Sequence, residues 1–227
     1  MVSQVDAQPH TTTALVSRPA EIRDLPQITR VHMAAFPGFF LSRLGPTFLE
    51  HHFYRIFLDA PEGILQVATA ADRLVGFVAG CIDPEKFYPH IRARKLQMLP
   101  ILLGRILCDP TLIRRILLNS RRVGNGGYGL KPYPGVSAEL SSIAVDPTFS
   151  GKGVGRSLVN TFLACAATGG AGYVTLTTDT YENDRTNRFY EQLGFQRFNT
   201  FPQADGRVMN AYGIEVSPTT TRLPHVV

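Results

Sequence analysis

The chain's most distinctive chemistry-bearing stretch is a glycine-rich loop at residues 150–156, which reads Ser-Gly-Lys-Gly-Val-Gly-Arg. A strand-like run over 138–145 precedes it, Asp146 and Pro147 break that run, and apolar residues at helical spacing follow from Val154. Glycines let the backbone approach a ligand closely, and the first N–H groups of a helix are unpaired and favour negative charge. The spacing therefore predicts a site for a phosphate-bearing ligand.

Two common phosphate-binding loops do not fit this stretch. A P-loop requires G-x-x-x-x-G-K-[ST], but here Lys152 is followed by Gly153. A dinucleotide-binding G-x-G-x-x-G requires a glycine where Arg156 stands. A strand–helix turn that binds nothing remains the plain alternative to a phosphate site.

A second motif follows one expected helix and one expected strand later. After the strand-like run 173–178, residues 183–195 read N-x-x-T-x-x-F-Y-x-x-x-G-F. We expect a short helix that begins at Asn183 or Asp184 and ends at Gly194, which would take the left-handed conformation.

Together the two motifs resemble those of the GNAT superfamily of N-acyltransferases. Residues 145–156 are similar to its acyl-CoA pyrophosphate loop, Q/R-x-x-G-x-G/A, with Ser150 in place of Gln or Arg. Residues 183–195 are similar to its signature N-x-x-A-x-x-F-Y-x-x-x-G-F, with Thr186 in place of Ala. The resemblance implies an α/β fold of the GNAT acyl-CoA N-acyltransferase type, a mixed central sheet of about six or seven strands flanked by helices.

The segments before the loop predict elements in the order that the GNAT resemblance implies. We expect a strand over 14–18, one helix from Asp24 and a second from Leu44 or Pro46 to Leu58. A hairpin of strands 64–69 and 74–82 with Asp72 and Arg73 at the turn should follow. We expect a mobile N-terminal tail over 1–13, an N-acetyltransferase domain over 14–217 and a C-terminal tail over 218–227. With 227 residues, 44% of them hydrophobic, the chain can bury the core of one domain.

Residues 84–134 do not belong to the minimal pattern and predict a basic helical insertion. Ten Lys or Arg and one acidic residue lie between Lys86 and Lys131, whereas the whole chain has a net charge of +5, so the remainder is net acidic. One interpretation is a helical cap with a solvated basic face. Another is a lid that pairs with an anionic acceptor such as an amino sugar or its nucleotide, using Arg92, Arg94, Arg114, Arg115, Arg121 or Arg122. A third is peripheral contact with an anionic membrane.

The remaining composition argues against several other kinds of site. Cys81, Cys108 and Cys165 fall in apolar runs without C-x-x-C spacing, which favours reduced core residues over disulfides or metal ligands. His51 and His52 point to different faces of an expected helix, so no metal site is expected. No nucleic-acid-binding motif accompanies the basic insertion. The N-terminus lacks the pattern of a signal peptide, and we expect a cytoplasmic location.

Acyl transfer to an amine requires a base, because an alkyl ammonium has a pKa of about 10.4 and is largely protonated at neutral pH. Glu139 is the best candidate, since it lies in the strand that leads into the loop, and Asp179 at the end of the next strand is the alternative. Strand alternation would place Glu139, Ser141, Ile143 and Val145 on one face.

The resemblance implies the other roles. The central strand and its neighbour would splay apart, and the pantetheine arm would lie in the gap against the backbone of Ile143, Ala144 and Val145. Tyr190 would protonate the leaving thiolate, and Asn183 would contact the pantetheine or cap its helix. The residues implied to hold the pyrophosphate are Gly151, Lys152, Gly153, Val154, Gly155 and Arg156.

The sequence therefore predicts an acetyltransferase that moves an acetyl group directly from acetyl-CoA, its co-substrate, to a primary amine of a small, anionic acceptor, without a metal. A protein or peptide amine as acceptor, and a non-catalytic acyl-CoA-binding module, stay open as alternatives. The sequence leaves the oligomeric state open between monomer and homodimer.

Overall fold

The computed structural model describes residues 14–113, 133–203 and 206–217. Its seven strands form one mixed sheet in the order β1-β2-β3-β4-β5-β7-β6, so the expected α/β fold is confirmed. The strands are β1 (Leu15–Pro19), β2 (Gly63–Ala70), β3 (Arg73–Ile82), β4 (Ser137–Val145), β5 (Tyr173–Asp179), β6 (Gln196–Pro202) and β7 (Val208–Glu215).

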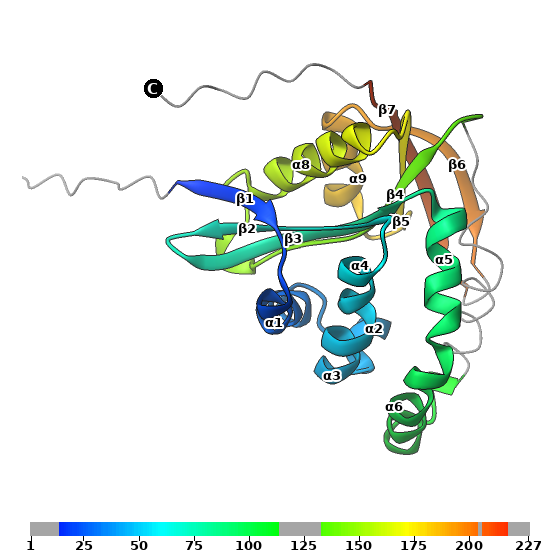
Figure 1. Cartoon of the computed structure of the whole chain (residues 1–227). Helices are drawn as coiled ribbons and strands as arrows, with labels where there is room; N and C mark the ends of the chain where they lie inside the picture. The colour runs from blue at the N-terminus through cyan, green and yellow to red at the C-terminus, as the bar shows by residue number, and fades with distance from the viewer. Residues whose placement is uncertain (1–13, 114–132, 204–205, 218–227) are drawn as a thin grey trace, which may run out of the picture.

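Helices cover both faces of this sheet (Figure 1). One face carries η1 (Ile22–Asp24), α1 (Leu25–Ala35), α2 (Phe40–Arg43), α3 (Pro46–Phe48), η2 (Leu49–Tyr54) and α4 (Arg55–Asp59). The other carries α8 (Val154–Thr168), preceded by the short turn η3 (Pro147–Phe149), and α9 (Asp184–Gln192). We call these the α1 face and the α8 face.

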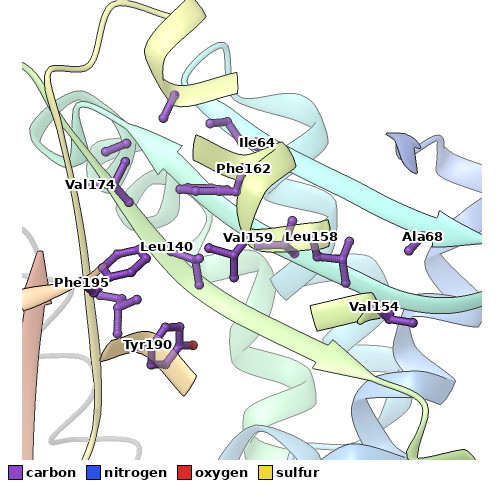
Figure 2. Close-up of a cluster of buried hydrophobic side chains, with 14 of the residues drawn as sticks. Ile64, Ala68, Leu140, Val154, Leu158, Val159, Phe162, Val174, Tyr190 and Phe195 are labelled. Atoms are coloured by element: carbon purple, nitrogen blue, oxygen red, sulfur yellow. The ribbon is translucent and has the colours of Figure 1, made fainter. Parts of the chain in front are cut away.

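Each face has its own apolar core. On the α8 face, Leu158 and Phe162 of α8 pack with Leu140 of β4 and with Tyr190 of α9 (Figure 2). On the α1 face, Phe77 of β3 packs with residues of α1, η2 and α4. Burial of apolar area on both sides stabilises a sheet whose central strands read as nearly continuous apolar runs.

The expected β2–β3 hairpin is present, but its turn lies one residue earlier than the expected Asp72-Arg73, because Arg73 already belongs to β3. Its turn is made by Ala71 (φ 48°) and Asp72 (φ 59°). Two consecutive positive φ angles are the geometry of the tight hairpin turn whose twist matches that of the flanking strands.

A β-bulge in β4 decides which way its side chains face. Leu140 pairs with Gly80 and Ser142 pairs with Ala79 on β3, so Ser141 is the extra residue. Gly80 permits this close approach, because a Cβ there would lie 2.2 Å from the carbonyl oxygen of Glu139. The bulge reverses the alternation of side chains from Ser142 onward.

The bulge overturns the expectation that Glu139, Ile143 and Val145 share a face. Ile143 and Val145 pack on the α8 face. Glu139 pairs with Cys81, and Ala144 pairs with Phe77; both partners belong to the core of the α1 face. Glu139 therefore lies on the α1 face, opposite to Ile143 and Val145.

The expected insertion is helical where the structure describes it. It contains α5 (Pro84–Ala93) and α6 (Lys95–Cys108), and α6 lies at the far end of the molecule from the sheet (Figure 1). Residues 114–132 of the insertion and the two expected tails lie outside the described residues.

Candidate active site

The glycine-rich loop is open on the side that a ligand would approach. Gly151 (φ 78°) and Gly153 (φ 80°) take left-handed conformations, and a Cβ built on either would meet no atom within 4 Å. Gly153 is the N-cap of α8, which begins at Val154. An L side chain would be strained at both positions, so the loop depends on glycine.

The backbone donors of this loop are available for an anion. The first intrahelical bond of α8 runs from the N–H of Ser157 to the carbonyl of Gly153 (3.0 Å). Within the described chain, no backbone carbonyl pairs with the N–H groups of residues 151–156. Several unpaired donors at a helix N-terminus form an anion-binding site.

Hydrogen bonds and an ion pair of Asp146 fix the turn that leads into the loop. The Asp146 carboxylate accepts hydrogen bonds from the backbone N–H (3.0 Å) and hydroxyl (2.7 Å) of Thr148, and it pairs with Arg73 (2.6 Å). The Thr148 hydrogen bond, more than the Arg73 charge, holds the pKa of Asp146 below its ordinary value. The ammonium of Lys152 lies 4.6 Å from the centre of the Phe149 ring.

Arg185 is a residue of this site that the sequence analysis missed. Its guanidinium, on the first turn of α9, donates to the Ser150 hydroxyl (2.9 Å). Ser150 occupies the motif position where the GNAT pattern has Gln or Arg, so Arg185 places a guanidinium beside that position from another helix. Two features of the sequence could have indicated this role. The second motif contains Arg185, and the first motif has Ser150 where the pattern has Gln or Arg.

The strands β4 and β5 separate beside the loop. They pair in parallel from Ser137 with Tyr173 as far as Leu140 with Leu176, and no further. The described chain places no strand against residues 141–145 on that side, whereas β5 continues to pair with β7 up to Asp179. The backbone of Ile143, Ala144 and Val145 therefore has an open edge that an extended ligand can fill.

Glu139 lies just before the point of separation, on the α1 face. It is half-buried, and its Oε1 accepts hydrogen bonds from the hydroxyls of Tyr88 (3.0 Å) and Ser141 (3.4 Å). Tyr88 belongs to α5, so the insertion contributes directly to the environment of this carboxylate. These contacts give Glu139 a fixed orientation beside the gap.

The alternative base, Asp179, has other partners. Arg207 lies 3.4 Å from its Oδ1. The backbone carbonyl of Asp179 accepts hydrogen bonds from the side-chain amides of Asn183 and Asn187, both at 3.1 Å. Asn183 is the N-cap residue of α9, but its side chain does not cap the helix and donates to Thr178 (2.7 Å) on β5 instead. Asn183 thus fixes the start of α9 to the end of β5.

Tyr190 lies on the opposite face from Glu139. Its ring packs against Phe189, Phe195 and Tyr212, and its hydroxyl is directed away from Phe195 (Figure 2). Burial raises the pKa of Tyr190, so the phenol stays protonated. Glu139 and Tyr190 therefore lie on opposite faces of the sheet, with Tyr190 in the core of the α8 face.

Cys81 is the described thiol nearest to this site along the sheet, since it pairs with Glu139. Burial, together with the Glu139 charge, raises the pKa of the Cys81 thiol well above its ordinary value. A nucleophilic cysteine requires a lowered pKa. Cys81 is therefore a core residue, and Cys165 packs partly buried against the core of the α8 face. The side chain of Cys108 lies outside the described residues.

Two basic side chains in the described part of the insertion form ion pairs. Lys86 pairs with Asp83 (2.9 Å), and Arg94 pairs with Asp59 (2.9 Å). Arg114, Arg115, Arg121 and Arg122 lie outside the described residues. Leu96, Leu99, Leu103 and Leu107 form an exposed stripe on α6. Membrane contact through the insertion stays a prediction.

Two further features concern the described residues alone. They contain no group of three His, Cys, Asp or Glu side chains placed to hold a metal ion. No helix among them is long and apolar enough to cross a membrane.

Sequence comparisons find related proteins. A family model described as the acetyltransferase (GNAT) domain matches residues 115–197. The N-alpha-acetyltransferase RimI of Mycobacterium tuberculosis is 39% identical over 64 residues, which are 28% of this chain and 38% of that relative's length.

The fold is shared with solved structures of low sequence identity. An acetyltransferase of the GNAT family from Desulfovibrio desulfuricans is 17% identical with a TM-score of 0.58, and the match covers 90% of this chain and all of that one. Arabidopsis thaliana NAA60 in complex with acetyl-CoA is 15% identical with a TM-score of 0.55, over 89% of this chain and 99% of that one.

Proposed function

We propose that this chain is a GNAT-type acetyltransferase that transfers an acetyl group from acetyl-CoA directly to a primary amine. The observation that supports this most strongly is the continuity of two open features. The unpaired N–H groups of residues 151–156 lead directly to the open β4 edge at residues 141–145. A pyrophosphate on the loop and an extended pantetheine arm along β4 would occupy them in that order.

The two faces of the gap would serve the two substrates. Coenzyme A would enter from the α8 face, where the loop and Tyr190 lie. The amine would enter from the α1 face, where Glu139 lies. An N–H of the open β4 edge would donate to the thioester oxygen, which gains negative charge as the amine attacks.

The proposed step balances without a covalent enzyme intermediate. Glu139 accepts a proton from the acceptor ammonium, and the neutral nitrogen attacks the thioester carbon. The C–N bond forms and the C–S bond breaks as Tyr190 donates its proton to the departing thiolate. The amide nitrogen releases its second proton to solvent, from which Tyr190 regains its own, and Glu139 returns to the carboxylate by releasing the ammonium proton to solvent. The raised pKa of Cys81 also favours direct transfer over a thiol relay.

Two acceptor classes are candidates. The net basic insertion favours a small anionic amine, such as an amino sugar or its nucleotide. The identity to RimI, whose name states an N-alpha-acetyltransferase, favours the α-amine of a protein or peptide. The ion pairs of Lys86 and Arg94 leave less positive charge in the described part of the insertion for an anion, which supports the peptide amine.

Calorimetry and an amine panel test the proposal together. The purified protein should bind coenzyme A with measurable heat, and it should acetylate one class among glucosamine 6-phosphate, spermidine and short peptides with a free α-amine. Binding without turnover of any amine would instead favour a non-catalytic acyl-CoA-binding module. Absence of binding would overturn the proposal.

A further inference from the structure

Two buried side chains, His32 and Tyr54, and the half-buried Ser142 form a hydrogen-bonded series that ends at the gap between β4 and β5. The Nδ1 of His32 lies 2.5 Å from the Tyr54 hydroxyl, which lies 3.2 Å from the Ser142 hydroxyl. His32 is 3% exposed and Tyr54 is fully buried. Neither motif of the GNAT resemblance includes any of these three residues.

Separate elements bring these residues together. His32 lies on α1, Tyr54 is the last residue of η2, and Ser142 follows the bulge in β4. The η2 segment is π-helical, a form that occurs mostly as single turns and often at functional sites. Ser142 has no strand beside it on the β5 side within the described chain, so the chain of hydroxyls ends at the open edge.

The environment of His32 makes its imidazole neutral. Its ring packs among Phe36, Tyr54 and Phe77, and burial lowers its pKa to about 4. Burial also raises the pKa of Tyr54, so the phenol keeps its proton. Among the described residues, the second ring nitrogen of His32, Nε2, has no hydrogen-bond partner.

Donor and acceptor strengths set the direction of the hydrogen bonds between His32, Tyr54 and Ser142. A phenol is a stronger donor than a neutral imidazole N–H, and an imidazole nitrogen is a stronger acceptor than a phenol oxygen. Tyr54 therefore donates to Nδ1 of His32, which strengthens its oxygen as an acceptor for the Ser142 hydroxyl. With its proton directed inward, Ser142 presents its lone pairs to the gap.

We propose that Ser142 binds an N–H of the acceptor amine, and that Tyr54 and His32 are positioning residues that hold the Ser142 hydroxyl in this direction. This inference rests on the proposed function. It gives the acceptor nitrogen two partners on the α1 face of β4: Glu139, which takes one proton from the ammonium, and Ser142, which orients one of the two remaining N–H bonds. The nitrogen lone pair is then free to attack the thioester carbon.

Steady-state kinetics with the best amine of the panel test this role. Ser142→Ala should lower kcat/KM for the amine about 10-fold, the effect of one lost hydrogen bond to a neutral group, without changing the affinity for coenzyme A. Tyr54→Phe should lower it about 3-fold, because the Ser142 hydroxyl remains but can rotate. Thr29→Val on the same buried face of α1 is the matched control and should leave the kinetics unchanged.

A double-mutant cycle separates positioning from a merely structural effect. Tyr54→Phe should have no further effect on kcat/KM when it is added to Ser142→Ala, since no hydroxyl is left to orient. Additive effects in the cycle, or full activity of Ser142→Ala, would overturn the inference while the wild-type turnover still supported the proposed function. A wild-type protein inactive on every amine would contradict the proposed function itself.

The direction of the chain has a test that does not depend on turnover. Nitrogen NMR of the imidazoles should find His32 neutral, with its proton on Nε2 and with Nδ1 accepting a hydrogen bond that Tyr54→Phe removes. A proton on Nδ1 of His32 would reverse the direction of these hydrogen bonds and contradict the proposed orientation of the Ser142 hydroxyl.

Discussion

Glu139 and Ser142 lie on the same face of β4, although an odd number of positions separates them. In a regular strand such residues would face opposite sides of the sheet. The extra residue Ser141 brings both to the α1 face, next to the point where β4 and β5 part. A carboxylate and a hydroxyl thus lie on the side that we assign to the acceptor amine.

The role of Glu139 predicts a deficit that depends on pH. Glu139→Gln should lower kcat by about 10²-fold or more at neutral pH, with the affinity for coenzyme A unchanged. The deficit should shrink as the pH rises toward the pKa of the amine, because more of the acceptor is then already neutral. Rate measurements from pH 7 to pH 10 check this. An equal deficit at every pH would contradict the role of a base.

The role of Tyr190 predicts a decrease in kcat that a loss of packing alone does not explain. Tyr190→Phe keeps the ring and should lower kcat by about 10²-fold, because the leaving thiolate loses its proton donor. Tyr212→Phe is the matched control, since Tyr212 is a buried neighbour whose hydroxyl bonds to Asn187 and Glu191 at 3.0 Å. That control should lose stability and keep its kcat. Equal kcat values for both variants would contradict the assignment.

Arg185 should contribute to the affinity for coenzyme A. Arg185→Ala removes the guanidinium beside Ser150 and should raise the dissociation constant of coenzyme A about 10-fold, while kcat at saturation changes little. Arg188→Ala, an exposed arginine on the same helix, is the control and should leave the affinity unchanged. Calorimetry measures both. Loss of affinity in the control alone would contradict this use of Arg185.

The loop conformation should depend on Gly153. Gly153→Ala places a side chain at φ 80°, which we expect to cost about 1 kcal/mol and to weaken binding of coenzyme A by tilting the N–H groups. Gly206→Ala introduces the same kind of strain at φ 92°, also in open space, and should reduce stability without changing that affinity. Thermal unfolding and calorimetry distinguish the two effects.

The neutral state of His32 predicts that stability falls in mild acid. Its pKa of about 4 in the folded protein lies below the ordinary value of 6.5, so the unfolded chain binds a proton first as the pH decreases. Above pH 6.5 His32 is neutral in both the folded and the unfolded protein and does not reduce the free energy of unfolding. As the pH falls from 6.5 toward 4, the unfolded chain alone binds the proton, and the free energy of unfolding decreases. Between pH 7 and pH 5 the loss should be about 2 kcal/mol in the free energy of unfolding.

Urea unfolding of the wild type and of His32→Gln at both pH values measures this contribution. The variant should be less stable at pH 7 but should lose about 2 kcal/mol less than the wild type on acidification. His51→Gln, which replaces an exposed histidine, should behave like the wild type. Identical pH dependence in His32→Gln and the wild type would show that His32 is not the group responsible.

The sequence by itself determined the loop at 151–156, the helix that follows it, and the family signature at 183–195. These features depend on local chemistry: glycine alone adopts the left-handed conformations of Gly151 and Gly153 without strain, and Gly194 (φ 91°) ends α9 as expected. The resemblance to the GNAT superfamily implied the mixed sheet, and patterns within short segments predicted the hairpin and the helical start of the insertion.

Only the tertiary structure decided what surrounds the proposed reaction. The bulge at Ser141 depends on the register against β3 and on the space at Gly80, so alternation within β4 could not reveal it. Arg185 reaches the loop from α9, and Tyr54 reaches Ser142 from η2, across 35 and 88 positions of sequence. Such contacts arise when separately formed elements pack on one sheet, and no local pattern of residues encodes them.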